Sequence, residues 1–266
     1  GCHFRQNQKN EVKISAILPL TGNASIVGQK AKDALLFSES FFNDSLLKNS
    51  KYKIKIIIED GAGIPATSIS ALNKILSIDK AEIVLSIISP VDLAIIPIQN
   101  EKRFLFISHA THPKLSGVNE LVFRHSPTVE QEFELLKKTI RLMDEKVILI
   151  YNNDDYGVAL KELFNKNLSQ INVFSLETNT ASQKILTQKV MMKDPRDIIL
   201  CGNSKILQPQ IKALKESGFK GTIYTTLGYA ATGGLDFFKN DKFIASIDFS
   251  QLEKTNEFQK ISDSFK

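Results

Sequence analysis

The stretch EKVILIYNNDDYG, residues 145–157, decides the fold of this chain. Its apolar part, 147–151, is followed by a polar turn and by a helix that we expect to begin near Gly157. A run of Val, Ile and Leu without polar alternation is typical of a parallel strand buried between two layers of helices. Ligands bind such sheets beyond the carboxyl ends of the strands, where helix N-termini offer unpaired N–H groups. The stretch therefore predicts an α/β fold with a loop placed to hold a ligand.

The same alternation runs along almost the whole chain. Further strands are predicted at 12–18, 52–58, 82–87, 104–107, 172–176, 197–201, 222–225 and 243–247. A first helix begins near Gly28, with an apolar face between residues 31 and 42, and others are predicted at 67–77, 91–100, 130–143, 158–168, 181–192 and 206–216. Apolar strands separated by helices predict parallel sheets covered on both faces. With right-handed crossovers, each half becomes a doubly wound α/β/α layer sandwich.

The alternation breaks once, at residues 123–128 around Pro127, and then restarts. We therefore expect two lobes, 11–124 and 125–248, which follow a flexible N-terminal tether at 1–10 and precede a C-terminal helix at 249–266 that leads toward a hinge. Two similar lobes with a cleft between them form a ligand-binding clamp, because small-molecule sites concentrate in clefts between domains.

The composition restricts the class of partner. Of the 266 residues, 42% are hydrophobic and 24% charged, which is typical of a folded globular protein. The net charge is +5, but Lys and Arg are scattered among Glu and Asp without a basic run, so we expect no nucleic-acid partner. No apolar run approaches the roughly 18 residues needed to span a bilayer.

The two cysteines have different settings. Cys201 ends an apolar run and is predicted to be a small core residue rather than a reactive thiol. Cys2 follows Gly1 and precedes a polar stretch, which resembles the cleaved junction of a bacterial lipoprotein with Cys2 as the lipidated residue. An incidental terminal cysteine is the alternative. A disulfide between a tail and a core strand is not expected.

Polar residues follow several of the predicted strands in the first half. Thr21 comes after the first strand, Ser89 after the third, and Ser108, His109 and Thr111 after the fourth. Hydroxyls and free backbone amides at such positions suit a carboxylate or another hydrogen-bonding group. For Thr21, a role in forming the turn is an equally good interpretation.

Signatures of catalysis and of metal binding are missing. The chain has no G-x-S-x-G, H-E-x-x-H or Walker-type motif, so we expect neither an enzyme nor a cofactor. Asp154 and Asp155 are interpreted as helix-capping groups rather than as an acid/base pair. His109, His112 and His125 lack the Cys, Asp or Glu that would complete a zinc site, and no metal is predicted.

Three segments in order, 12–22, 56–60 with Pro65, and 153–157, resemble the periplasmic binding proteins of the leucine/isoleucine/valine type. Residues 106–115 and 122–124 are similar to that family's exit from its first lobe, and the resemblance covers residues 11–265. It implies a two-lobed clamp of type I that closes on a small polar solute, amino-acid-like or related, and delivers it to an ABC permease. The protein would be a monomer, periplasmic or anchored to the bacterial envelope through Cys2.

Carried over by position, the resemblance implies a set of ligand contacts. Ser89 and Thr111 match the family's hydroxyls for the carboxylate and ammonium of an amino acid, and His109 stands where backbone groups do similar work. Tyr156 matches the aromatic residue of the second lobe that closes over the ligand. With Thr21, Ser108 and Asn203, these residues form the predicted site.

The chain also departs from the family pattern. Val27 and Asn203 stand where amino-acid binders usually have tyrosines, and Leu227 where an acid normally pairs with the ammonium. Because a buried ammonium without a partner costs several kcal/mol, a standard α-amino acid is doubtful as the ligand. The family's C-terminal return segment is also missing, either because the sequence is truncated or because the protein is a shortened relative. These departures favour an alternative, an envelope lipoprotein that uses the same fold as a protein-interaction or regulatory module with a degenerate cleft.

Overall fold

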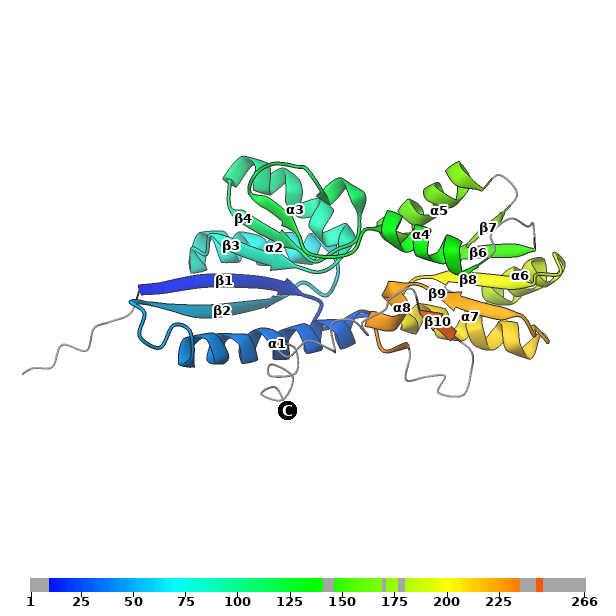
Figure 1. Ribbon diagram of the computed structural model, residues 1–266, viewed down its shortest axis with the longest axis horizontal. Helices are drawn as coiled ribbons and strands as arrows, with labels where there is room; N and C mark the ends of the chain where they lie inside the picture. Colours follow the sequence, from blue (N-terminus) through cyan, green and yellow to red (C-terminus); the bar gives the residue numbers. More distant parts are fainter. Residues whose placement is uncertain (1–9, 141–145, 169–170, 177–179, 235–242, 246–266) are drawn as a thin grey trace, which may run out of the picture. The chain divides into compact units, whose positions relative to one another are not determined.

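The computed structural model describes residues 10–140, 146–168, 171–176, 180–234 and 243–245 (Figure 1). The chain divides into two compact units, residues 1–110 with 114–125 and residues 111–113 with 126–266. The sequence placed the boundary between the lobes after residue 124. Cys2, nearly all of the predicted tether and the predicted C-terminal helix at 249–266 lie outside the described residues, and they stay predictions.

The first unit contains a five-stranded parallel sheet in the order β2-β1-β3-β4-β5. Its strands are β1 (Asn10–Leu18), β2 (Tyr52–Asp60), β3 (Ile83–Ser86), β4 (Leu105–Ser108) and β5 (Val122–Arg124). Its helices are α1 (Ser25–Asp44), α2 (Pro65–Lys74), which continues as the π-helical turn η1 (Ile75–Asp79), and α3 (Ser89–Lys102); a 3-10 turn, η2 (Pro113–Leu115), follows β4. The sequence predicted four of these strands but assigned the residues of β5 to the end of the lobe.

The second unit contains another five-stranded parallel sheet, in the order β10-β9-β8-β6-β7. Its strands are β6 (Val147–Tyr151), β7 (Asn172–Ser175), β8 (Asp197–Cys201), β9 (Thr222–Thr225) and β10 (Phe243–Ala245). Its helices are α4 (Val129–Thr139), α5 (Asp155–Asn167), α6 (Thr180–Met191), α7 (Ser204–Glu216) and the short α8 (Leu227–Ala231). The α/β class predicted from the sequence, with parallel sheets, is confirmed.

The two sheets have the same topology. The first strand of each unit, β1 or β6, lies second from one side of its sheet. The next strand along the chain, β2 or β7, pairs with it on the outside, and the remaining strands follow in order toward the other side. The strand order therefore reverses between β1 and β3 in the first unit and between β6 and β8 in the second. In doubly wound sheets, ligands bind at this reversal, beyond the carboxyl ends of the two strands. In each unit, the loops at the carboxyl ends of the strands are consequently suited to a ligand.

Packing differs between the two sheets. In the second unit both faces are buried, one under α4 and α5 and the other under α6 and α7. In the first unit α2 and α3 pack on one face over β1, β3, β4 and β5. On the opposite face α1 lies along β2 and β1 (Figure 1), and the cover thins toward β5, where the side chain of Phe123 is 54% exposed.

One glycine in each unit lets the helix that follows the unit's first strand approach the end of that strand. A β-carbon at Gly28, in α1, would lie 2.1 Å from the carbonyl oxygen of Pro19. A β-carbon at Gly157, in α5, would lie 2.0 Å from the carbonyl oxygen of Asn152. Any side chain would therefore push the helix away, so these glycines bring the helix N-terminus against the carboxyl end of β1 or β6.

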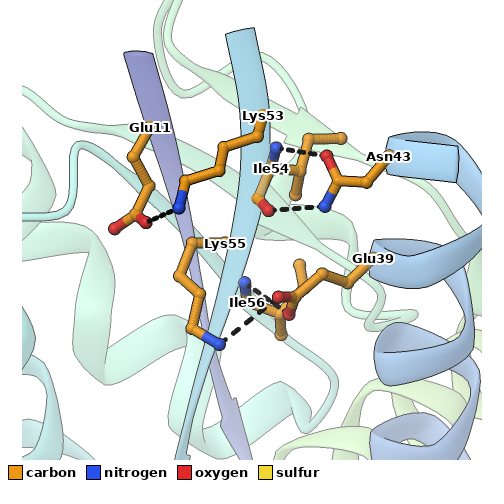
Figure 2. Close-up of polar contacts among 7 residues, drawn as sticks. All are labelled: Glu11, Glu39, Asn43, Lys53, Ile54, Lys55 and Ile56. Carbon is orange, nitrogen blue, oxygen red and sulfur yellow. Dashed lines mark hydrogen bonds and ion pairs between the residues drawn. The ribbon is translucent and has the colours of Figure 1, made fainter. Parts of the chain in front are cut away.

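The outer edge of β2 is closed by side chains of α1 (Figure 2). The Asn43 amide accepts a hydrogen bond from Ile54 N and donates one to Ile54 O, both 2.8 Å long. One turn earlier, Glu39 accepts from Ile56 N at 2.9 Å and pairs with Lys55 at 3.3 Å. Side chains of a helix thus take the place of a neighbouring strand, which protects an edge that would otherwise be open to pairing.

Candidate functional site

The polar turn of residues 152–157 begins α5 in the second unit. Asp154 is the N-cap of α5, and its Oδ1 accepts a hydrogen bond from Gly157 N at 2.8 Å. Asn152 Nδ2 donates to the other carboxylate oxygen at 2.5 Å. Burial raises the pKa of Asp154 above its ordinary value, although both hydrogen bonds favour the charged form. The capping role expected of Asp154 is confirmed.

Tyr156 is joined to two other segments through Glu132, a residue of α4 that is only 4% exposed. Tyr156 Oη donates a hydrogen bond of 2.6 Å to Glu132 Oε2. The backbone N–H of Leu227, where α8 begins, donates to Glu132 Oε1 at 2.5 Å. Burial, and then the negative charge of Glu132, raise the pKa of Tyr156 well above its ordinary value. Two positions singled out in the sequence, 156 and 227, therefore meet at a carboxylate that the sequence did not indicate.

Asn203 stands on the neighbouring loop, after β8. Its side chain caps α7 by accepting from Ile206 N at 3.1 Å. The loops after β8 and β9 approach closely, because a β-carbon at Gly228 would lie 3.2 Å from Gly202 O and 3.3 Å from Cε1 of Tyr156. The loops carrying positions 156, 203 and 227 therefore form one continuous surface, which we call the second-unit edge: the loops after β6, β8 and β9.

Cys201 lies beneath the second-unit edge and is fully buried. Burial, together with the negative charges of Glu132 and Asp154, raises the pKa of its thiol well above the ordinary value. A thiol with a raised pKa forms little of the thiolate that reacts with electrophiles or metals. Its predicted identity as a core residue is confirmed.

In the first unit, Thr21 is bound to Asp60, the last residue of β2. Thr21 Oγ1 donates to Asp60 Oδ2 at 2.7 Å, and the same carboxylate accepts from Leu20 N at 3.0 Å, Thr21 N at 3.3 Å and Ala62 N at 2.8 Å. Burial alone would raise the pKa of Asp60, but these hydrogen bonds outweigh it and lower the pKa below its ordinary value. The contacts of Thr21 therefore support the turn-forming alternative left open by the sequence.

Ser108 ends β4 and is fully buried. Its hydroxyl donates a short hydrogen bond to the carboxyl group of Asp92, which lies in the first turn of α3 and is also fully buried. Burial raises the pKa of Asp92 to about 7, against the hydrogen bond from Ser108 that favours its charged form. Ser89 begins α3 and is 7% exposed. Asp92 thus ties the first turn of α3, which Ser89 begins, to the end of β4.

His109 and His125 stack on each other in the first unit, with ring centroids 5.5 Å apart. His109 N donates to Ser86 O at 2.8 Å, which ties its loop to the end of β3. Burial lowers the pKa of His109. Thr111 belongs with the second unit, where its carbonyl oxygen accepts from Val129 N at 3.1 Å at the start of α4. The loops after β1, β3 and β4 form the first-unit edge.

The described ranges contain no group of three or more His, Cys, Asp or Glu placed to hold a metal ion. In the same ranges, no helix is both long enough and apolar enough to cross a membrane.

A family model described as periplasmic binding protein matches residues 11–247. The chain belongs to the periplasmic binding protein family. This match covers both units and all of the sites described above. A search of curated proteins finds no match.

Solved structures show the same fold in other periplasmic binding proteins. A possible leucine/isoleucine/valine-binding protein from Rhodopirellula baltica is 16% identical, with a TM-score of 0.79 over 97% of this chain and 74% of its own. The branched-chain amino acid transporter substrate binding protein LivJ from Streptococcus pneumoniae, in complex with isoleucine, is 14% identical, with a TM-score of 0.79 over 96% and 76%. A solute binding protein of an ABC transporter from Rhodopseudomonas palustris, in complex with 3,4-dihydroxy benzoic acid, is 14% identical, with a TM-score of 0.74 over 96% and 73%.

Proposed function

We propose that this periplasmic binding protein is the solute-binding protein of an ABC importer, and that it binds a small polar ligand, amino-acid-like or related, by closure of its two lobes. The family match over residues 11–247 carries the proposal. Two proteins of the same fold were solved with isoleucine and with 3,4-dihydroxy benzoic acid, both of which carry a carboxylate. Ligand binding would shift an equilibrium between open and closed arrangements of the lobes. The ABC permease in the membrane would be its partner.

The proposed ligand contacts are Ser89 and His109 from the first unit, with Thr111 and Tyr156 from the second. Ser89 begins a helix, where free N–H groups favour an anion such as a carboxylate. Thr21, Ser108 and Asn203 are assigned a supporting role, because their side chains are bound to other residues of the chain. Leu227 brings no acid to the site, but Glu132 places a carboxylate against its backbone.

The experiment is a thermal-shift screen followed by calorimetry. Candidates are amino acids, their amides, ureas, and small aliphatic and aromatic carboxylates. A ligand at 100 times its Kd should add about 2.7 kcal/mol to the free energy of unfolding. Ser89→Ala should weaken binding of any compound that stabilises the protein, whereas Ser70→Ala, an exposed serine of α2, should not. If no compound stabilises the protein, solute binding is the wrong function.

A second candidate is an envelope protein that uses the fold as an interaction or regulatory module. One observation favours it: the side chains of Thr21, Ser108, Tyr156 and Asn203, all predicted to contact a ligand, are engaged with other groups of the chain. Site-specific photo-crosslinking in cells, from the first-unit edge and the second-unit edge, would distinguish the two candidates. If the protein serves an importer, it should capture a permease. Capture of another envelope protein, together with a negative ligand screen, would favour the module.

Anchoring through Cys2 is compatible with both candidates. It predicts that the protein expressed behind a lipoprotein signal peptide incorporates labelled palmitate, and that Cys2→Ser abolishes the incorporation. Cys201→Ser is the matched control, because Cys201 is fully buried in the fold. Equal labelling of the Cys2→Ser variant would contradict the anchor without affecting either candidate function.

A further inference from the structure

Glu132 has an unusual position for a carboxylate, because its side chain is 4% exposed and lies against two hydrogen-bond donors. The donors come from distant parts of the chain: Tyr156 opens α5, and Leu227 opens α8. Glu132 itself stands in the first turn of α4, where the helix dipole favours a negative charge. Its two carboxylate oxygens are divided between the donors, Oε2 for Tyr156 Oη at 2.6 Å and Oε1 for Leu227 N at 2.5 Å.

We infer that Glu132 is the positioning residue of the second-unit edge, fixing both the Tyr156 ring and the turn at Leu227. The inference rests on the proposed function, because it concerns how the second lobe presents Tyr156 to a solute. The ring of Tyr156 packs against the core of the second unit, and its hydroxyl fixes where the end of the side chain points. Here the hydroxyl is held by a charge-assisted hydrogen bond, which is stronger than a neutral one. The ring also packs beside Gly228, where a β-carbon would lie 3.3 Å from Cε1 of Tyr156.

This arrangement restricts how Tyr156 meets a solute. A phenol has one proton to donate, and Glu132 receives it. Toward a bound molecule, Tyr156 therefore offers its ring and the remaining lone pairs of its oxygen, and not a hydrogen-bond donor. The second-unit edge consequently suits an apolar or aromatic surface, or an N–H or O–H donor, at Tyr156. A solute carboxylate is expected to be met by the first unit instead.

The test needs no ligand. Ring-labelled tyrosine, with ¹³C at Cζ, reports ionisation of the five tyrosines separately by NMR, and Tyr156→Phe assigns the signal of Tyr156. Glu132→Gln keeps the size of the side chain but removes its charge. The pKa of Tyr156 should then fall by about one unit or more, since a nearby negative charge shifts a pKa by 1–3 units. The ¹³Cζ signal of Tyr156 should also move at neutral pH, because the hydroxyl then donates to a neutral amide oxygen instead of a carboxylate.

Ile140→Ala is the control for a purely structural effect. Ile140 follows α4 and is 1% exposed, so this variant destabilises the same region without touching the hydroxyl of Tyr156. It should leave the titration and the ¹³Cζ signal of Tyr156 unchanged. If Glu132→Gln leaves both unchanged, or if Ile140→Ala changes them equally, Glu132 does not position Tyr156. Should Glu132→Gln fail to fold, Glu132→Met, which keeps the length of the side chain and removes its charge, is held to the same criterion. A negative ligand screen would reject solute binding, but it would not affect the NMR test of whether Glu132 positions Tyr156.

Discussion

The side chain of Asn43 and the peptide unit of Ile54 exchange two hydrogen bonds, both 2.8 Å long (Figure 2). This is how an adjacent strand would pair with β2. Asn43→Ala leaves a backbone donor and a backbone acceptor of Ile54 without this partner, so the free energy of unfolding should fall by about 1–3 kcal/mol. The uncovered edge should also promote self-association at high protein concentration.

Urea unfolding and sedimentation velocity would measure the two effects. Lys30→Ala is the matched control, because Lys30 is an exposed residue of the same helix. The edge-closing role would be rejected if Asn43→Ala remained a monomer with the stability of the control.

Asp92 predicts a dependence of stability on pH. Burial raises its pKa in the folded protein to about 7, from an ordinary value of 3.8. Between about pH 4 and pH 7 the unfolded chain has therefore lost a proton that the folded chain still holds, and this group's contribution to stability falls as pH rises. Asn cannot ionise. The stability of Asp92→Asn relative to the wild type should grow across this window by a few kcal/mol, at about 1.4 kcal/mol per unit of pKa.

Urea unfolding of both proteins at several pH values gives this difference directly, and contributions of other groups cancel in it. A difference that stays constant from pH 4 to pH 7 would contradict the buried, neutral Asp92.

Much of the fold was predictable because the central strands are fully buried. The predicted bounds of β6, β8 and β9 agree with the structure to the residue. In β6 and β8 the reason is that a parallel strand covered on both faces is a nearly continuous apolar run. β5 was not predicted. It has only three residues, one of them Arg124, and it is recognisable as a strand only through its pairing with β4. α8, with five residues, is likewise too short for a helical pattern.

The site was predictable in part for a similar reason. Strand ends and helix starts can be found locally, so the loops carrying Tyr156 and Asn203 were placed correctly between β6 and α5 and between β8 and α7. The partners of these side chains were not found. Glu132 and Leu227 are 95 residues apart, and no local pattern distinguishes a carboxylate that will be buried from one that remains in water. Such contacts depend on how helices pack in three dimensions.

Asp60 predicts a graded loss of stability in the loop after β1. Its carboxylate accepts from three backbone N–H groups and one hydroxyl, so Asp60→Ala should lower the free energy of unfolding by about 1–3 kcal/mol. Thr21→Val removes only the hydroxyl bond and should cost about 1 kcal/mol or less. Because the pKa of Asp60 is lowered in the folded protein, its contribution is present above about pH 4 and lost as pH falls below it.

Chemical denaturation at pH 7 and pH 3 would check both the order and the pH dependence. Equal losses for the two variants, or a loss for Asp60→Ala that persists undiminished at pH 3, would show that the carboxylate does not organise the loop.

Replacing Gly157 by Ala should change stability in the direction opposite to the one that helix propensity alone predicts. In an exposed helix, Gly→Ala stabilises by about 1 kcal/mol. Here the new β-carbon would lie 2.0 Å from Asn152 O, so α5 would have to move away from the end of β6. Gly157→Ala should therefore destabilise the protein by about 2 kcal/mol or more. Because Tyr156 is the preceding residue, the displacement should also change its ¹³Cζ signal. Glu162→Ala, at an exposed position of the same helix, is the control and should leave both stability and signal nearly unchanged. A stabilised Gly157→Ala would mean that α5 does not depend on this close approach.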